Sequence, residues 1–91
     1  MTEYKPNYCL HPGAFLKDDL KTLHISISKA AKLTGITPKR LRDIIKGHES
    51  IYLIDARKFE ELTGELAYFW MNSQEKWNDW QKAKETQRVG Q

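Results

Sequence analysis

The chain of 91 residues has a single cysteine, so no disulfide bond can form within it and its fold must rest on packing. It has no apolar run near the roughly 20 residues that a membrane-spanning helix needs. Its first residues, MTEYKPNYCL, lack the basic start and apolar stretch of a secretory signal. We therefore expect a cytoplasmic protein that does not contact a membrane.

A large excess of charge of one sign is also missing. The 15 lysines and arginines against 12 acidic residues give a net charge of +3, which permits nucleic-acid binding without requiring it. Hydrophobic residues make up 40% and charged residues 30%, a balance typical of a soluble globular domain and not of a disordered chain. The placement of the cations along the chain must therefore decide what the protein binds.

Five segments have the features of helices, and no segment is convincing as a strand. Ser26 and Thr37 are good N-caps, and Gly47 and Gly64 are natural helix stops. The predicted helices start at Pro12, after Ser26, at Pro38, near residue 55 and near residue 66. The last one extends to about residue 84. Because the connections are short, the sequence predicts an all-α, five-helix bundle over residues 10–84, between an N-terminal arm (1–9) and a polar tail (85–91).

The segment GITPKRLRDIIKG, between Gly35 and Gly47, concentrates cations on one face of a predicted helix. Its apolar positions follow the i, i+3, i+4 spacing of a buried face: Leu41, Ile44 and Ile45. Its charged positions point the other way, with one arginine on the flank: Lys39, Arg42, Asp43 and Lys46 outward, and Arg40 between the faces. A solvated face of an ordinary helical bundle is the alternative interpretation.

A tight corner precedes this helix and favours a function in DNA binding. The turn TGIT has a glycine at its centre, and the small residues Ala30 and Ala31 let the two flanking helices approach closely. These features predict a helix-turn-helix over about residues 27–46. In such a unit the second helix enters the major groove, where outward cations meet phosphates and guanine edges.

Three stretches of the sequence resemble a known family. The run ISISKAAKLTGITPKRLRDIIKG resembles the helix-turn-helix of the Xre/Cro repressor group, with apolar and small residues at the spacings that this group uses. HPGAFLKDDL before it and ELAYFWMNSQ after it resemble the HigA-type antitoxins, also called the VapI family. The resemblance covers about residues 10–74 and implies a bundle of the lambda-repressor-like helix-turn-helix type. Ala14 and Ala67 depart from the glutamate and proline common in the family, which affects the expected helix boundaries.

The resemblance also implies a function in two parts. The protein would repress its own operon by binding double-stranded operator DNA as a homodimer. It would also bind and neutralise a cognate toxin, in this family usually an mRNA endonuclease of the RelE type. No enzymatic activity and no cofactor are expected. A stand-alone Xre/Cro-type repressor and a protein-interaction module that has lost DNA binding are the alternatives.

Residue roles follow from the same resemblance. Positions expected to touch bases lie at the start of the second helix of the motif and one turn later: Thr37, Pro38, Lys39 and Asp43. Positions expected near the sugar–phosphate backbone flank them: Ser28, Lys29, Lys46 and His48. Since Pro38 has no side-chain donor, Lys39 and Arg40 are expected to make more of the hydrogen bonds to the bases. Arg42 is expected to contact a phosphate. Asp43 would be repelled by phosphates, so we expect it either to accept from a cytosine amino group or to fix Lys39 or Lys46 in one rotamer.

Two tryptophans on the last predicted helix exceed what a small core needs. Phe69 and Trp70 suit the core, whereas Trp77 and Trp80 could cover the first helix or form a dimer or toxin interface. The three histidines do not cluster with Cys9 at any metal-ligand spacing, so no metal site is predicted.

Overall fold

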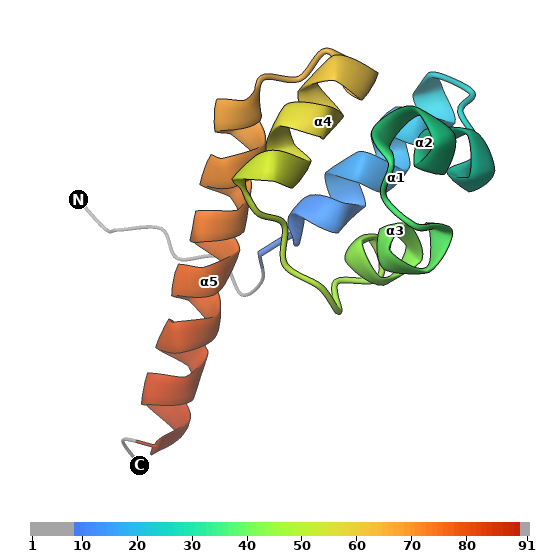
Figure 1. The fold of residues 1–91 in the computed structure, drawn as a ribbon. Helices are drawn as coiled ribbons and strands as arrows, with labels where there is room; N and C mark the ends of the chain where they lie inside the picture. The colour runs from blue at the N-terminus through green and yellow to red at the C-terminus, as the bar shows by residue number, and fades with distance from the viewer. Residues whose placement is uncertain (1–8, 90–91) are drawn as a thin grey trace.

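In the computed structural model, which describes residues 9–89, the chain forms five helices and no strand within that range. They are α1 (Pro12–Thr22), α2 (Ile27–Thr34), α3 (Pro38–Ile45), α4 (Leu53–Thr63) and α5 (Ala67–Val89). Helices α1 to α4 form the globule, and the long α5 packs along α4 and α1 before its C-terminal part extends beyond them (Figure 1). The predicted all-α, five-helix fold is confirmed. The expected arm over residues 1–9 lies outside the described residues, apart from Cys9.

Three helices start at a residue whose side chain caps them, and two of these caps, Ser26 and Thr37, were predicted. The side chains of His11, Ser26 and Thr37 each accept a hydrogen bond from a backbone N–H in the first turn of α1, α2 and α3, at 2.9, 3.1 and 3.1 Å. Gly47, one residue after the C-cap of α3, has a φ of +82°, the left-handed conformation that glycine adopts without strain. Local sequence chemistry therefore sets the ends of the helix-turn-helix.

Two helix boundaries differ from the prediction. Helix α4 begins at Leu53 and not at Asp55, because the Asp55 carboxylate accepts from the backbone N–H of Tyr52 and caps a turn that starts earlier. Helix α5 continues to Val89, so residues 85–89 of the expected polar tail are helical. No glycine or proline interrupts the sequence there before Gly90, so nothing in it stops the helix.

The core lies where α5 crosses α4 and α1. Trp70 and Phe59 are fully buried, with ring centroids 5.2 Å apart, and the Trp70 indole N–H donates to the backbone carbonyl of Glu65 at 3.2 Å. Phe69 is half-buried and meets Phe15 of α1 edge to face, with ring centroids 5.3 Å apart. These contacts confirm the expected core role of Phe69 and Trp70 and fix α5 against the globule.

Helices α1 and α3 meet at very close range through Gly13. A Cβ atom at this position would lie 1.8 Å from the backbone carbonyl oxygen of Ile44. Only glycine fits here, and the contact seats the inner face of α3 directly on the first turn of α1. The position of α3 relative to the globule thus depends on the absence of a Cβ atom at Gly13.

Candidate nucleic-acid interface

Helices α2 and α3 form the predicted helix-turn-helix. Gly35 ends α2 with a φ of +79°, and the next residue, Ile36, is buried. Thr34 is also buried, and its hydroxyl accepts a hydrogen bond from the Ile36 N–H at 3.1 Å and donates to the carbonyl of Ala30 at 2.8 Å. The corner is therefore held by internal hydrogen bonds and one apolar anchor, which leaves α3 exposed on its other side (Figure 1).

Helix α3 has a buried face and an exposed face, with Arg40, Asp43 and Ile45 of intermediate exposure between them. Leu41 and Ile44 are fully buried, while Lys39, Arg42 and Lys46 are exposed. Thr37 and Pro38 are exposed at the N-terminus of the helix. An exposed helix N-terminus with cations behind it suits the approach to a polyanion, because the unpaired N–H groups there carry a partial positive charge.

The flanking candidates are also on the surface. Ser28 and Lys29 are exposed in the first turn of α2, and His48 is exposed in the loop after α3. Together with the outward residues of α3, they extend the polar surface of the helix-turn-helix to both of its ends.

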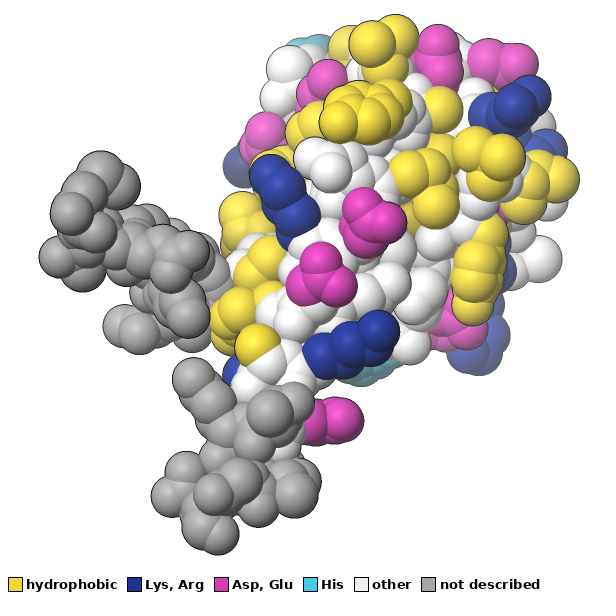
Figure 2. Space-filling model, turned by 90° about the vertical axis from the view of Figure 1, so that its left-hand side faces the viewer, with side chains coloured by type: hydrophobic (Ala, Val, Ile, Leu, Met, Phe, Trp, Pro, Cys, Tyr) yellow, Lys and Arg dark blue, Asp and Glu magenta, His cyan; other side chains and the backbone are white. Residues whose placement is uncertain are grey.

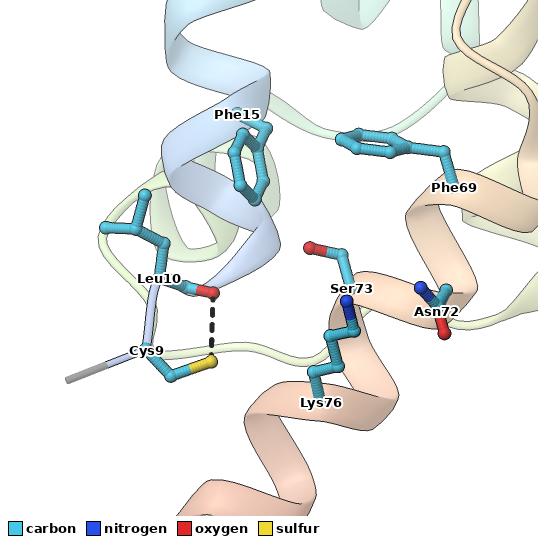
Figure 3. Close-up of a pocket in the computed structure, with 7 residues that line it drawn as sticks. All are labelled: Cys9, Leu10, Phe15, Phe69, Asn72, Ser73 and Lys76. Atoms are coloured by element: carbon cyan, nitrogen blue, oxygen red, sulfur yellow. Dashed lines mark hydrogen bonds between the residues drawn. The ribbon is translucent and has the colours of Figure 1, made fainter. Parts of the chain in front are cut away.

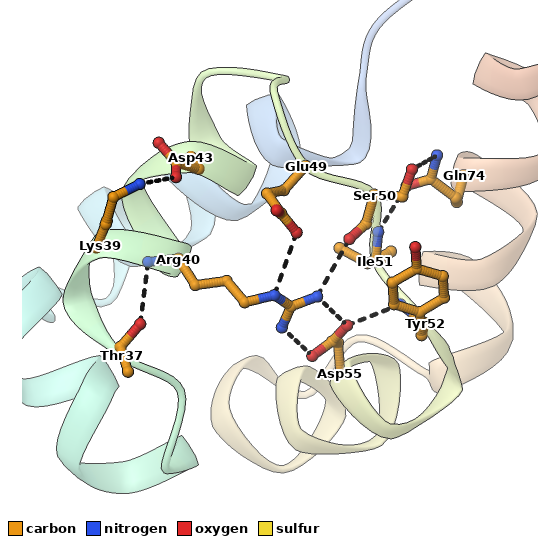
Figure 4. A network of polar contacts seen from close by, with 10 residues as sticks. All are labelled: Thr37, Lys39, Arg40, Asp43, Glu49, Ser50, Ile51, Tyr52, Asp55 and Gln74. Atoms are coloured by element: carbon orange, nitrogen blue, oxygen red, sulfur yellow. Dashed lines mark hydrogen bonds and ion pairs between the residues drawn. The ribbon is translucent and has the colours of Figure 1, made fainter.

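Arg40 does not fit the role predicted for it. Its two terminal nitrogens donate to the two carboxylate oxygens of Asp55 at 2.7 and 2.9 Å, and its Nε donates to Glu49 at 3.3 Å. One terminal nitrogen also donates to the backbone carbonyl of Ser50 at 3.3 Å. Figure 4 shows the side chain extending from α3 toward the start of α4, away from Lys39. We therefore remove Arg40 from the set of DNA-contacting residues.

The partner of Arg40 is a buried acid that the sequence did not bring to attention. Burial pushes the pKa of Asp55 upward, but hydrogen bonds from Arg40 and from the Tyr52 backbone, with the charge of Arg40, hold it below its usual range. The pKa of Arg40 is raised, chiefly by the hydrogen bond to Asp55. The pair stays ionised and joins α3 to α4. The sequence did contain one signal for this role: an acidic residue at the third position of a helix can accept from the backbone N–H of the N-cap residue, here Tyr52.

A second polar contact continues this network toward α5. The side-chain oxygen of Gln74, which is buried, accepts from the Ile51 backbone N–H at 2.9 Å, and its nitrogen lies 3.0 Å from the Asn78 side-chain oxygen (Figure 4 shows the first contact). The loop between α3 and α4 is thus fastened on one side to Arg40 and on the other to α5.

Asp43 pairs with the lysine one turn before it. Lys39 Nζ and Asp43 Oδ2 are 2.8 Å apart, and the lysine side chain is 82% exposed against 27% for the aspartate. The hydrogen bond lowers the pKa of Asp43 and raises the pKa of Lys39. The geometry matches the second of the two predicted roles for Asp43, in which it fixes a neighbouring lysine.

Trp77 and Trp80 lie on the part of α5 that leaves the globule. The ring of Trp77 meets the ring of His11 edge to face, with centroids 5.2 Å apart, so it covers the start of α1. Trp80 stands 5.3 Å from Trp77 between centroids, and Lys84 Nζ lies 4.5 Å above its ring. Trp77 is therefore partly used within the protomer, while Trp80 lies farther out along α5.

Cys9 lines a hollow of about 320 Å³ between the start of α1 and α5. Figure 3 shows Phe15 of α1 and Phe69 of α5 on one side of it, and Ser73 and Lys76 of α5 on the other. The thiol donates weakly to the carbonyl of Leu10 at 3.7 Å. The Nδ1 atom of the neighbouring His11 accepts a hydrogen bond from the Gly13 backbone N–H of its own helix.

No group of three or more metal-ligating side chains comes together among residues 9–89. Within the same part of the chain, no helix has both the length and the apolarity needed to span a membrane.

The fold and the exposed face of α3 define a helix-turn-helix protein. No family model matches the chain. It is 36% identical to virulence-associated protein A′ of Dichelobacter nodosus over 69 residues, which is 75% of this chain and 60% of that protein. The chain thus spans less than two thirds of the length of this relative.

Two solved structures extend the comparison. An addiction module antidote protein of the HigA family from Coxiella burnetii matches with a TM-score of 0.80 and 27% identity, over 88% of each chain. PA4674 of Pseudomonas aeruginosa, solved in complex with its operator DNA, matches with a TM-score of 0.72 and 26% identity, over 78% of this chain and 77% of that one. The predicted resemblance to the HigA-type antitoxins of the helix-turn-helix group is confirmed.

Proposed function

We propose that this protein is an antitoxin that binds operator DNA through α3, represses its own operon and neutralises a cognate toxin. The observation that carries the DNA-binding part is the exposed cationic face of α3 over the buried anchor of Leu41 and Ile44. The likeness to a protein solved on its operator supports the same function. The protein acts as a homodimer in the cytoplasm, because a palindromic site offers each copy one half-site.

The residues of this face divide into two groups by position. Thr37, Pro38 and Lys39 enter the major groove first, and Lys39 reaches a base edge. The remaining contacts are to phosphates and come from both sides of the groove: Ser28, Lys29, Arg42, Lys46 and His48. Phosphate contacts supply affinity and register, and base contacts supply the sequence preference.

The toxin is an mRNA endonuclease of the RelE type, as the family resemblance implies. It binds to a surface of the antitoxin other than the exposed face of α3. The outer part of α5, with Trp80 half-exposed under Lys84, is remote from the recognition face and is the surface that we assign to it. Separate surfaces let one antitoxin hold the operator and the toxin together.

The DNA-binding part is tested by fluorescence anisotropy with the DNA upstream of the protein's own gene and with a scrambled duplex, at several salt concentrations. We expect tighter binding to the upstream DNA and a steep loss of affinity with salt on both. Lys82→Ala, which removes an exposed cation on α5, serves as a control for net charge and should bind as the wild type does. Equal affinity for both duplexes would remove the repressor function.

The toxin-binding part is tested by co-expression with the adjacent open reading frame. Growth rescue by the wild type, and by a Lys39→Ala/Arg42→Ala double variant that no longer binds the operator, is the expected result. Operator binding without rescue identifies a stand-alone repressor. Rescue without any operator binding identifies an interaction module.

A further inference from the structure

The hollow between the start of α1 and α5 has an apolar side and a polar side. Its volume is about 320 Å³, near the lower end of the roughly 300–1,000 Å³ of pockets that hold small organic ligands. Leu10, Phe15 and Phe69 make its apolar lining, and the two aromatic rings meet edge to face (Figure 3). Ligand sites combine such a wall with a few convergent polar groups, so the polar side decides what this hollow can bind.

Ser73 places a buried hydroxyl on the polar side. The residue is only 9% exposed, and Figure 3 shows its hydroxyl pointing from α5 into the space between the two helices. The helical threonines Thr34 and Thr63 each donate their hydroxyl to the backbone carbonyl four residues earlier, at 2.8 Å. Ser73 makes no such bond, and within residues 9–89 its hydroxyl has no other partner. A buried hydroxyl without a partner is costly, so a ligand that supplies an acceptor gains affinity there.

Lys76 adds a positive charge to the same side. It follows Ser73 by three residues on α5, so the two side chains share a face of that helix. The lysine is exposed, forms no ion pair within the described part of the chain, and extends its ammonium group toward Ser73 in Figure 3. None of the residues that line the hollow is acidic. The hollow therefore has one positive charge that no carboxylate in its lining neutralises.

We propose that this hollow binds a small organic acid, whose carboxylate is held by Lys76 and Ser73. A carboxylate only accepts hydrogen bonds and does so at both oxygens, so one group satisfies the ammonium and the hydroxyl together. The apolar body of the ligand lies against the two phenylalanine rings, where an aromatic ring can add a further edge-to-face contact.

The surroundings favour a ligand that is charged at one end and apolar at the other. Figure 2 shows hydrophobic side chains beside charged ones on the side of the molecule that α5 forms. An inorganic anion would leave the apolar lining in contact with water, and a purely apolar ligand would leave the Ser73 hydroxyl without an acceptor. No residue of α2 or α3 lines the hollow, so binding there does not depend on the proposed contact with DNA.

The test uses the full chain with 3-phenylpropionate, and with 3-phenylpropionamide as the neutral isostere. Isothermal titration calorimetry at neutral pH, where the acid is ionised, should give a dissociation constant of about 1 mM or lower, which is the range open to so small a ligand. The amide should bind about fivefold or more weakly, because it pairs with no charge and offers one acceptor oxygen in place of two.

Two lysine variants test the assigned charge. Lys76→Met removes the charge and keeps the length of the side chain, and Lys82→Met does the same for an exposed lysine of α5 outside the hollow. Lys76→Met should bind the acid about fivefold or more weakly and should no longer distinguish it from the amide. Lys82→Met should bind both as the wild type does. Ser73→Ala should also weaken binding of the acid, so the result does not depend on one variant.

Cys9 reports where the ligand sits, because it is the only cysteine and lines the hollow. With the acid at about ten times its dissociation constant, the rate at which iodoacetamide alkylates Cys9 should fall about tenfold, since the unoccupied fraction falls by that factor. Mass spectrometry measures this rate. Absence of binding to the wild type up to about 10 mM overturns the proposal. Binding that Lys76→Met leaves unchanged, or that does not protect Cys9, overturns it as well.

Discussion

Arg40 and Asp55 form a two-pronged ion pair across the junction of α3 and α4, with both terminal nitrogens of the arginine on both oxygens of the carboxylate at 2.7 and 2.9 Å. The aspartate side chain is only 3% exposed, while the arginine is 30% exposed. The same carboxylate also caps α4. One acid thus fixes the recognition helix to the rest of the bundle and sets where the next helix begins.

Arg40→Ala should destabilise the fold by about 2–4 kcal/mol, because it leaves the buried Asp55 without its counter-ion. Urea denaturation followed by circular dichroism measures the loss. Arg57→Ala, which removes an exposed cation from α4, is the matched control and should change stability by less than about 0.5 kcal/mol. In Arg40→Gln the charge is removed, so an arginine that contacts no phosphate leaves the salt dependence of DNA binding as in the wild type. A salt slope reduced by about one unit in Arg40→Gln would mean that the arginine contacts phosphate after all.

Gly13→Ala should destabilise the protein by about 2–3 kcal/mol, although alanine is normally the better helix former. The added methyl group collides with the backbone of Ile44, which cannot move aside as a flexible side chain would. Thermal unfolding of Gly13→Ala and Gly64→Ala provides the comparison. A Cβ at Gly64 meets open space, and its cost of about 1 kcal/mol comes from the φ of +87° alone. Equal losses in the two variants would show that α1 and α3 can separate freely.

The ends of the helices were predictable because their chemistry is local. Ser26, Thr37 and Gly35 act on the backbone within a few residues of themselves, so a short stretch of sequence contains the whole interaction. The buried face of α3 followed in the same way from the spacing of Leu41 and Ile44.

The role of Arg40 was not predictable in this way. Its position between the inward and outward faces of α3 allows it to turn to either side, and the partner that decides lies 15 residues later in the chain. The same holds for the contact of Gln74 with Ile51, which spans 23 residues. Long-range polar contacts leave no periodic pattern in the sequence. A set of DNA-contacting cations predicted from sequence alone therefore includes cations, such as Arg40, that stabilise the fold instead.

Acidification should destabilise the wild type through His11. Burial lowers the pKa of this histidine, with a partly opposing effect of the Glu49 backbone, and Nδ1 must stay unprotonated to accept from Gly13. A histidine whose pKa is lower in the folded than in the unfolded state contributes to the free energy of unfolding. This contribution is complete at a pH above the unfolded pKa of about 6.5, and it is lost as the pH falls through the lower pKa of the folded state. Urea midpoints at pH 7.5, 6.5 and 5.5 should decline more for the wild type than for His11→Asn, which keeps a cap acceptor without the titration. Parallel curves for the two proteins would exclude His11 as the group responsible.

Lys46→Ala should weaken binding to operator and random DNA alike and reduce the salt slope by about one unit, as expected for one lost phosphate contact. The side chain is exposed at the C-terminal end of α3, so the fold should keep its stability. Anisotropy titrations at four salt concentrations measure the slope, with Lys82→Ala as the control for net charge. A loss confined to the operator would instead assign Lys46 to base recognition.

Asp43→Ala should relax the preference for the operator by about 1–3 kcal/mol at one base pair, while binding to random DNA stays equal or becomes tighter. In the wild type Asp43 holds Lys39 at 2.8 Å, which restricts where the lysine can donate, and its negative charge opposes the phosphates. Titrations with operator, operator variants and random duplexes measure both effects. A Lys39→Ala background separates the two predicted roles: if Asp43 acts by fixing the lysine, its removal there changes the operator preference no further, whereas a direct contact with a cytosine amino group leaves the full effect on preference. If Asp43→Ala weakens both kinds of DNA equally, the residue is a structural brace, and the assignment of this face of α3 to sequence recognition is wrong.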